Sequence, residues 1–294
     1  MNVLTRMRIG EGLSSGERAL ADVILASPDV FLAGGSKQLV ARAHVSKSTA
    51  YRLCEKLGCS GLSELRVRVA SELEAYRGEA GAVDVNFPVR AGQGSAEVIS
   101  GIEADLAQTL AATANVLDPS ALDRASELVL SAAHVDILAT AGNVAFAQNF
   151  RFQMAEIGRA VSAPVDEYEQ RLLVASADET HVVVLVSFGG RGFVSRPAAC
   201  QLAGRGVPVV LIASAEATPL DEFATVKLAL SPHEDHAHKV SPFGTGVSLL
   251  LVLDALFARC FVEDYDGNLA RRFAYYERVV DSGGCGGGRS RAAR

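Results

Sequence analysis

Residues 46–57, Ser-Lys-Ser-Thr-Ala-Tyr-Arg-Leu-Cys-Glu-Lys-Leu, carry a pronounced helical pattern. Ala50, Leu53, Cys54 and Leu57 recur at the spacing of one helix face, so this face should be buried. The opposite face and its flanks are short, polar and cationic: Ser48, Tyr51, Arg52, Glu55 and Lys56. The segment therefore predicts an amphipathic helix with a small exposed polar surface.

The residues around this helix predict where it begins and ends. Ser46 is suited to cap its N-terminus, and Gly58 stands where a left-handed C-terminal cap belongs. Upstream, Ser36 can cap a helix that runs to Arg42, which leaves only residues 43–45 to turn the chain. This is the spacing of a helix-turn-helix motif.

A helix-turn-helix pair suits DNA, because the major groove admits one α-helix whose N-terminal side chains face the base edges. Lys and Arg side chains nearby would neutralise phosphates. The candidate DNA-binding residues are Lys37, Ser46, Lys47, Ser48, Thr49, Arg52 and Lys56. An ordinary small helical bundle shows the same apolar stripe, so the pattern alone also fits a purely structural helix.

Charge is divided unevenly along the 294 residues. Residues 1–77 hold 11 Lys and Arg against 8 Asp and Glu, a net charge of +3, whereas residues 78–294 have a net charge of −9. Only the first part should be attracted to a phosphate backbone. Because a net charge of +3 is modest, one DNA-binding domain should bind weakly. We therefore expect tight binding to require a dimer, whose two DNA-binding domains contact a palindromic DNA operator.

Several motifs in the first 75 residues occur together and in order. They are Leu13-Ser14-Ser15-Gly16-Glu17-Arg18-Ala19-Leu20-Ala21 with Ile24-Leu25, Ser36 to Ala41, Val45 to Gly58, and Gly61-Leu62-Ser63-Glu64-Leu65-Arg66. This set resembles the N-terminal domain of the RpiR/MurR family of bacterial transcription regulators. His44 departs from it, since the family usually has a small residue in this turn. The resemblance implies a C-terminal SIS (sugar isomerase) domain that binds a phosphosugar.

Length and composition fit this organisation. The length predicts about two domains. The five cysteines are odd in number and widely spread, which favours reduced thiols in the cytosol. Met1 to Glu11 lacks the apolar core of a signal peptide, and the most apolar segment, Val247 to Phe261, is interrupted by charge and reads as too short to cross a membrane. We therefore expect a cytoplasmic protein.

The rest of the chain predicts a second domain of another class. Residues 78–95 read as a linker, helical periodicity resumes at Ala96, and Asp118-Pro119 begins a further helix that ends near Ser131. Short β-branched runs then alternate with helical segments, at Val135–Thr140, Val182–Phe188, Val207–Ala213 and Val226–Leu230, with a weaker strand at Ala160–Ala163. The expected architecture is an all-α domain (1–77) followed by a doubly wound, SIS-like α/β domain (96–282) with a parallel sheet of about five strands. Residues 283–294 read as a disordered tail.

Ligands of open parallel sheets bind at the carboxyl ends of the strands. Two predicted strand ends carry glycines together with polar groups: Thr140-Ala141-Gly142-Asn143, and Ser187-Phe188-Gly189-Gly190-Arg191-Gly192. The SIS resemblance implies phosphate-binding hydroxyls in both loops. Here Asn143 and Val144 replace two serines of the first loop, while Gly189 and Gly192 replace a serine and a threonine of the second. Of the family pattern, Gly142, Ser187 and Gly190 remain.

Three interpretations of this crevice stay open: a sugar phosphate with Arg191 as the central cation, another small anion or an uncharged sugar, or no ligand in a domain kept for dimerisation. The resemblance adds Glu234 as an acidic residue near the sugar. His233, Glu234, Asp235, His236 and His238 also resemble a metal-binding cluster, but we favour a solvated loop and expect neither metal nor cofactor. The expected ligand-binding residues are Thr140, Gly142, Asn143, Ser187, Gly190, Arg191 and Glu234.

The sequence thus favours a non-enzymatic, homo-oligomeric transcription regulator of the RpiR type that binds a DNA operator and a small effector. The first alternative is a sugar-phosphate isomerase-like enzyme, which is disfavoured because most of the phosphate-binding hydroxyls are missing. The second is a DNA-binding dimer whose SIS domain no longer senses a ligand.

Overall fold

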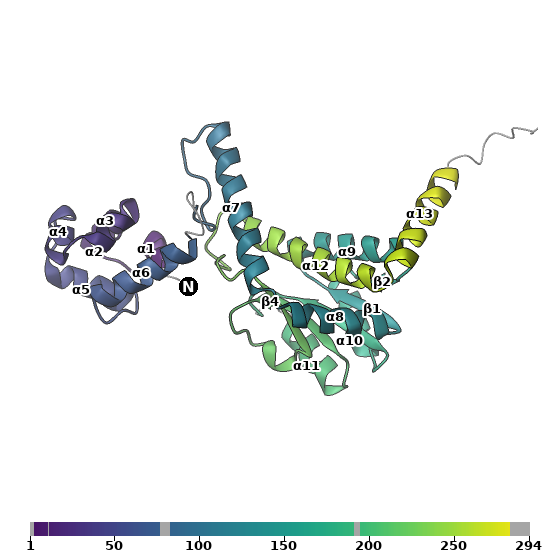
Figure 1. Cartoon of the computed structure of the whole chain (residues 1–294). Helices are drawn as coiled ribbons and strands as arrows, with labels where there is room; N and C mark the ends of the chain where they lie inside the picture. The colour runs from purple at the N-terminus through teal and green to yellow at the C-terminus, as the bar shows by residue number, and fades with distance from the viewer. Residues whose placement is uncertain (1–2, 11, 77–82, 191–194, 283–294) are drawn as a thin grey trace, which may run out of the picture. The chain divides into compact units, whose positions relative to one another are not determined.

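The computed structural model describes residues 3–10, 12–76, 83–190 and 195–282. It divides into two compact units, one of residues 1–109 with 233–243 and the other of residues 110–232 with 244–294. The predicted tail at 283–294 and Arg191 lie outside the described residues. Figure 1 shows the course of the chain and labels its elements.

The first unit contains six short helices and most of a seventh: α1 (Val3–Ile9), α2 (Ser15–Ala26), α3 (Pro28–Ala33), α4 (Ser36–Arg42), α5 (Lys47–Lys56), α6 (Leu62–Tyr76) and α7 (Ser95–Val116). The apolar faces of α1 to α6 share one core, in which Met7, Leu20, Ile24, Leu53 and Leu65 are fully buried. The predicted all-α first domain is therefore confirmed. The sequence interpretation missed α1, a helix of only seven residues.

The second unit is built on a five-stranded sheet: β1 (His134–Leu138), β2 (Val161–Ser162), β3 (His181–Val186), β4 (Val209–Ser214) and β5 (Val226–Leu230). All its strand pairs are parallel and their order is β2-β1-β3-β4-β5. This confirms the predicted parallel sheet. The chain moves outward from β1 to β2 and returns to β3 on the other side, so the topological switch point lies between β1 and β3.

Helices cover both faces of the sheet, and alternate strand residues enter the two cores. Val182, Val184 and Val186 of β3 pack with α8 (Pro119–Ser131), α9 (Val144–Glu156) and α12 (Phe243–Glu263). Val183 and Leu185 pack on the opposite face with α10 (Glu167–Ser176) and α11 (Ser195–Gly204). The remaining helix, α13 (Tyr265–Ser282), contacts α9. The domain is doubly wound, as predicted.

Helix α12 corrects one expectation. The apolar segment Val247 to Phe261 was interpreted as too short to cross a membrane, but the helix that contains it has 21 residues, from Phe243 to Glu263. Among the described residues it is the one helix long and apolar enough to span a bilayer. Leu249, Val252, Leu253 and Leu256 are buried against the sheet, so the helix supplies a core face.

Candidate functional site

The N-terminus of α5 is capped as the sequence predicts. The Ser46 hydroxyl accepts the backbone N–H of Thr49 at 3.2 Å. It also lies 2.7 Å from the Ser48 hydroxyl and 2.9 Å from the Thr49 hydroxyl. The first turn of α5 therefore presents an ordered group of hydroxyls at the surface.

The faces of α5 also match the prediction. Ala50, Leu53, Cys54 and Leu57 are at most 2% exposed. The opposite side leaves a polar row at the surface, formed by Ser46, Lys47, Ser48, Arg52 and Glu55. Gly58 ends the helix with a φ of +76°, and the N–H of Cys59 bonds the carbonyl of Cys54 at 2.8 Å.

The turn before α5 holds an unusual backbone. His44 has a φ of +51°, in the left-handed region that glycine or asparagine adopts more readily. The helix before it, α4, begins one residue earlier than a Ser36 cap would place it: Gly35 is the N-cap and Ser36 is the first helical residue. The predicted Ser36 cap is therefore wrong. Lys37 lies in the first turn of α4, and its side chain is outside the described residues.

Lys56 lies at the last position of α5, away from the hydroxyl-rich first turn. Its ammonium group donates to the Glu17 carboxylate at 2.8 Å and to the Gly12 carbonyl at 2.6 Å. The other candidate DNA-binding residues with described side chains are on the first two turns of α5. Lys56 is thus engaged by its own domain.

A second candidate site lies at the switch point of the sheet. Leu138 of β1 pairs with Leu185 of β3, so the loops that follow these strands leave the sheet side by side. After β1, residues 141–143 form one 3₁₀ turn that leads into α9. Thr140, Ala141 and Gly142 are exposed, and no atom lies within 4 Å of where a Cβ on Gly142 would be. The backbone here is open to a ligand.

The loop after β1 has a strained backbone at Ala141 and is held by hydrogen bonds from Gln170 of α10. Ala141 has a φ of +53°, which is rare for a residue with a Cβ and is typical of functional loops. Gln170, 2% exposed, donates its amide N–H groups to the carbonyls of Ala139 at 2.8 Å and Pro164 at 3.0 Å. This anchor was not predicted from the sequence, because helix α10 was not predicted.

The loop after β3 is more enclosed. Ser187 is 8% exposed, and its carbonyl accepts the N–H of Gly190 at 3.3 Å. Gly190 has a φ of +66°, and a Cβ there would meet Pro219 at 3.0 Å and Thr218 at 3.1 Å. Glycine is needed for this close packing. Ser187 and Gly190 thus stand beside the β1 loop at the same end of the sheet.

Glu234 belongs to the other compact unit, in the segment 233–243. Its carboxylate is buried and lies 3.3 Å from the ammonium of Lys239. Asn86 fixes this segment by accepting the N–H of Asp235 at 2.6 Å and that of Val240 at 2.9 Å. Glu234 thus belongs to a different unit from the two strand-end loops, and its role at the crevice stays a prediction.

Asp105 of α7 faces the same segment and was not predicted as a site residue. Both of its carboxylate oxygens are fully buried and lack a close hydrogen-bond partner within the described residues. Burial and the nearby Glu234 carboxylate raise the pKa of Asp105 to about 6, although the Thr109 hydroxyl acts in the opposite direction. Among the described residues, no three His, Cys, Asp or Glu side chains are arranged to hold a metal ion.

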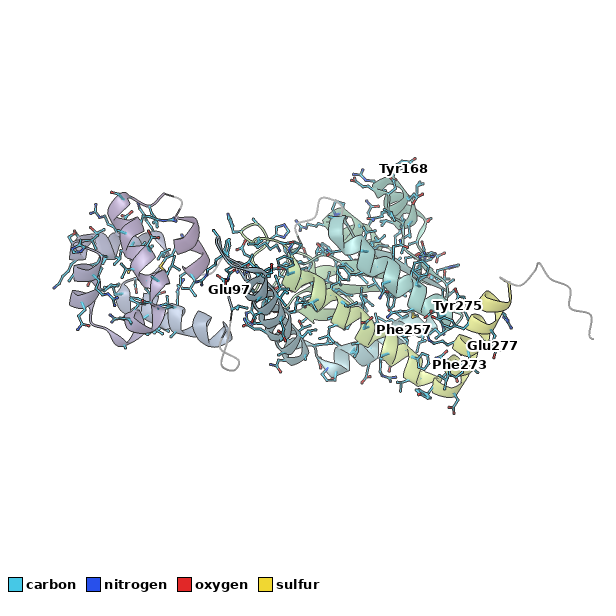
Figure 2. The ribbon with its side chains drawn as sticks, turned by 90° about the horizontal axis from the view of Figure 1, so that it is seen from above. Glu97, Tyr168, Phe257, Phe273, Tyr275 and Glu277 are labelled. Atoms are coloured by element: carbon cyan, nitrogen blue, oxygen red, sulfur yellow. The ribbon has the colours of Figure 1, made fainter. Side chains whose placement is uncertain are left out.

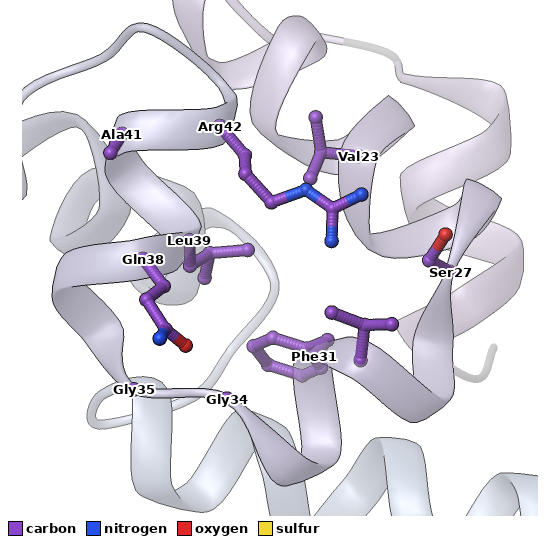
Figure 3. A pocket seen from close by; sticks show the side chains of 10 residues that line it. Val23, Ser27, Phe31, Gly34, Gly35, Gln38, Leu39, Ala41 and Arg42 are labelled. Carbon is purple, nitrogen blue, oxygen red and sulfur yellow. The ribbon is translucent and has the colours of Figure 1, made fainter.

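A cavity of about 430 Å³ lies within the helical unit, between α2, α3 and α4. Figure 3 shows Phe31 and Leu39 on its walls and Arg42 reaching across it. Arg66 closes the α3–α4 corner by donating to the carbonyl of Gly34 at 2.7 Å. The lining is mostly apolar, and this cavity does not coincide with the exposed first turn of α5.

These features define a class of protein: a helix-turn-helix unit joined to a doubly wound α/β domain. Residues 1–76 match the helix-turn-helix domain of the rpiR family, and residues 128–259 match the SIS domain. The chain belongs to the RpiR family of transcriptional regulators, with a helix-turn-helix domain and a SIS domain.

Two named relatives match this chain over most of their length. The chain is 28% identical to the HTH-type transcriptional regulator HexR of Pseudomonas aeruginosa over an alignment of 244 residues. This alignment covers 83% of each chain. It is 27% identical to HexR of Escherichia coli over an alignment of 257 residues. This alignment covers 87% of this chain and 86% of HexR.

Solved structures share the fold. The Vibrio vulnificus NanR protein complexed with ManNAc-6P covers 95% of this chain and 98% of its own, with a TM-score of 0.58 and 21% identity. The sugar isomerase domain of an RpiR transcription factor from Sphaerobacter thermophilus covers 62% of this chain and 96% of its own, with a TM-score of 0.53 and 22% identity. These likenesses confirm the SIS-like fold.

Proposed function

We propose that this chain is a cytoplasmic one-component regulator that binds a palindromic operator through α5 and senses a small metabolite in its SIS domain. The observation that carries the DNA-reading part is the exposed first half of α5, where the Ser46, Ser48 and Thr49 hydroxyls stand with Lys47 and Arg52. Side chains of this type at the N-terminus of a helix suit base edges and phosphates in a major groove.

DNA binding by this surface can be tested by removing one of its cationic side chains, that of Arg52. The chain would be mixed with a random duplex pool, and the enriched duplexes would define its preferred sequence. Arg52→Ala should abolish the preference without lowering the unfolding midpoint, because Arg52 is exposed. Arg171→Ala, an exposed arginine on α10 that pairs with Glu167 at 2.6 Å, is the matched control and should bind as the wild type does. Retained sequence preference in Arg52→Ala would contradict the assignment.

For the effector, we propose a sugar phosphate held in the crevice between the β1 and β3 loops. Three observations support it: the open backbone at Gly142, the left-handed Ala141, and the N-terminus of α9 directly after the 3₁₀ turn. The missing family hydroxyls would each have added about 1 kcal/mol, so we assign Arg191 the role of the compensating cation. NanR, which was solved with ManNAc-6P, supports this ligand class.

A thermal-shift screen separates the ligand classes. ManNAc-6P and other sugar phosphates would be compared with their unphosphorylated parents and with inorganic phosphate. We expect a shift that requires both sugar and phosphate, and that is reduced in Arg191→Ala and Ser187→Ala. An equal shift with the neutral sugar would support the uncharged-sugar alternative, and no shift with any compound would support the non-sensing dimer.

A catalytic role is disfavoured by the composition of the crevice. Residues 140–143 and 187–190 contain no His, Asp, Glu, Lys or Cys that would move a proton in an aldose-ketose conversion. The named relatives are transcriptional regulators. Turnover of a sugar phosphate by the purified chain would instead establish the isomerase alternative.

We also propose that the chain self-associates, because a single DNA-binding domain of modest charge would bind DNA weakly. Helix α13, which follows α12, carries an exposed aromatic surface: Tyr265, Phe273, Tyr275 and Tyr276 are 42–60% exposed. Figure 2 shows Phe257, Phe273 and Tyr275 along these two helices. Such a surface suits a protein interface. Light scattering should give a dimer or a tetramer, and Phe273→Glu should shift it towards the monomer.

A further inference from the structure

The C-terminal end of α5 is held by charged side chains from two neighbouring elements. From one side, Lys56 donates to Glu17 of α2 at 2.8 Å and to the carbonyl of Gly12 at 2.6 Å. From the other side, the Arg6 guanidinium of α1 donates to the carbonyl of Leu57 at 2.8 Å and to that of Lys56. The last turn of α5 is therefore attached to α1 and to the start of α2.

Glu17 shows why Lys56 is committed to this contact. Glu17 is 2% exposed, and its carboxylate also accepts the N–H of Ser14 at 2.7 Å within a capping box. The Lys56 ammonium, followed by the Ser14 backbone, lowers the pKa of Glu17 from 4.5 to about 2. A buried carboxylate that loses its cation is left without compensation. Of the groups around Glu17, Lys56 stabilises its ionised form most.

The position of this contact on α5 links it to recognition. Lys56 ends a helix whose first turns carry Ser46, Lys47 and Ser48, about 15 Å away along the axis. A change of tilt at the fixed end therefore moves the side chains that would face the base edges. Side chains that read bases must be placed to within a hydrogen-bond length, so a small tilt costs discrimination.

We propose that Lys56, Glu17 and Arg6 form a clamp that sets the orientation of the reading helix, and that Lys56 is a positioning residue that does not neutralise a phosphate. This proposal rests on the proposed DNA binding. It replaces the sequence-based expectation that the Lys56 ammonium contacts DNA, because that ammonium is held by Glu17 and by the Gly12 carbonyl.

The salt dependence of DNA affinity separates the two roles. Lys47→Gln removes an exposed cation beside the reading surface, and it should reduce the slope of log affinity against log salt concentration by about 1. Lys56→Gln should leave that slope unchanged on a random duplex. On a duplex enriched by the wild-type chain, Lys56→Gln should lower affinity about tenfold, the equivalent of one base contact.

A second substitution tests whether Lys56 acts through Glu17. The double variant Glu17→Gln/Lys56→Gln leaves no buried charge, so it should recover part of the affinity and of the unfolding midpoint lost in Lys56→Gln. A lysine that contacts phosphate would gain nothing from a change at Glu17. Lys56→Arg, which keeps a cation, should retain most of the wild-type preference.

The outcomes are distinct. An unchanged salt slope together with rescue by Glu17→Gln supports the clamp. A slope reduced by about 1 in Lys56→Gln, or no rescue in the double variant, overturns it. If the wild-type chain enriches no duplex, the proposed function fails, and the urea-unfolding cycle of Glu17 and Lys56 then tests the clamp alone: additive losses would overturn it.

Discussion

The Nδ1 atom of His181 lies 2.7 Å from the carboxylate of Asp136, and this pair joins the first residues of β3 to β1. Asp136 is 3% exposed, so the contact with His181 offsets part of the cost of burying its carboxylate. We expect His181→Ala to lower the free energy of unfolding by about 2–3 kcal/mol, because the buried carboxylate loses its partner.

The neighbouring His134 provides the control for this prediction. Its ring stacks on that of His181 at a centroid distance of 4.5 Å, but His134 is exposed. His134→Ala should therefore cost less than about 1 kcal/mol in urea unfolding. Equal losses in the two variants would show that the bond to Asp136 contributes little.

The backbone of His44 predicts a stabilising substitution. Its φ of +51° is unfavourable for a residue with a Cβ, and its side chain is exposed. His44→Gly should raise the free energy of unfolding by about 0.5–1 kcal/mol. Ala43→Gly, at a φ of −84° one residue earlier, should instead destabilise the domain. The idea fails if chemical denaturation finds both variants less stable than the wild type.

The pKa of Asp105 predicts a pH-dependent stability. Burial holds the proton on this carboxylate up to about pH 6, whereas the unfolded chain releases it near 3.8. The unfolded state therefore binds fewer protons between these values, and stability falls as pH rises through them. At pH 7–8 the ionised carboxylate costs roughly 2–3 kcal/mol, which Asp105→Asn should remove.

The advantage of Asp105→Asn should disappear below about pH 4, where the wild-type carboxyl is protonated in both states. Thermal or urea unfolding of the two proteins from pH 3.5 to 8 would show it. A variant with a constant stability difference across this range would contradict the assigned titration.

The hydrogen bonds of Gln170 should stabilise the loop after β1 at the crevice. Its amide bridges the carbonyls of Ala139 and Pro164 beneath the β1 loop. Gln170→Met keeps the volume but leaves the buried carbonyl of Ala139 and the part-buried carbonyl of Pro164 without this donor, which should cost about 2 kcal/mol of stability. It should also weaken the thermal shift given by any effector. Gln201→Met, on an exposed position of α11, should do neither.

The sequence predicted features whose causes are local. The helix α5 was predicted because its apolar spacing, the Ser46 cap and Gly58 all lie within 13 residues. The parallel strands were predicted because runs such as Val182 to Val186 are apolar on both faces. The two strand ends were predicted from the glycines and polar groups that follow the strands, in agreement with the SIS resemblance, and the pairing of β1 with β3 brings them together.

Features that depend on distant partners were not predictable. Lys56 was predicted to contact DNA because its partner Glu17 lies 39 residues away along the chain, so the sequence pattern around Lys56 does not show the contact. Ala141 gave no sign of a left-handed backbone, since alanine rarely adopts one. Glu234 was assigned to the crevice by resemblance alone, and the structure shows it beside Asp105 and Lys239.

The most direct test of the central claim is sequencing of the genomic DNA fragments that the purified chain retains, with Arg52→Ala and Arg171→Ala in parallel. The account predicts a few enriched fragments that share an inverted repeat, present for the wild type and Arg171→Ala and lost for Arg52→Ala. No enrichment by the wild-type chain, or the same enriched fragments with Arg52→Ala, would contradict it.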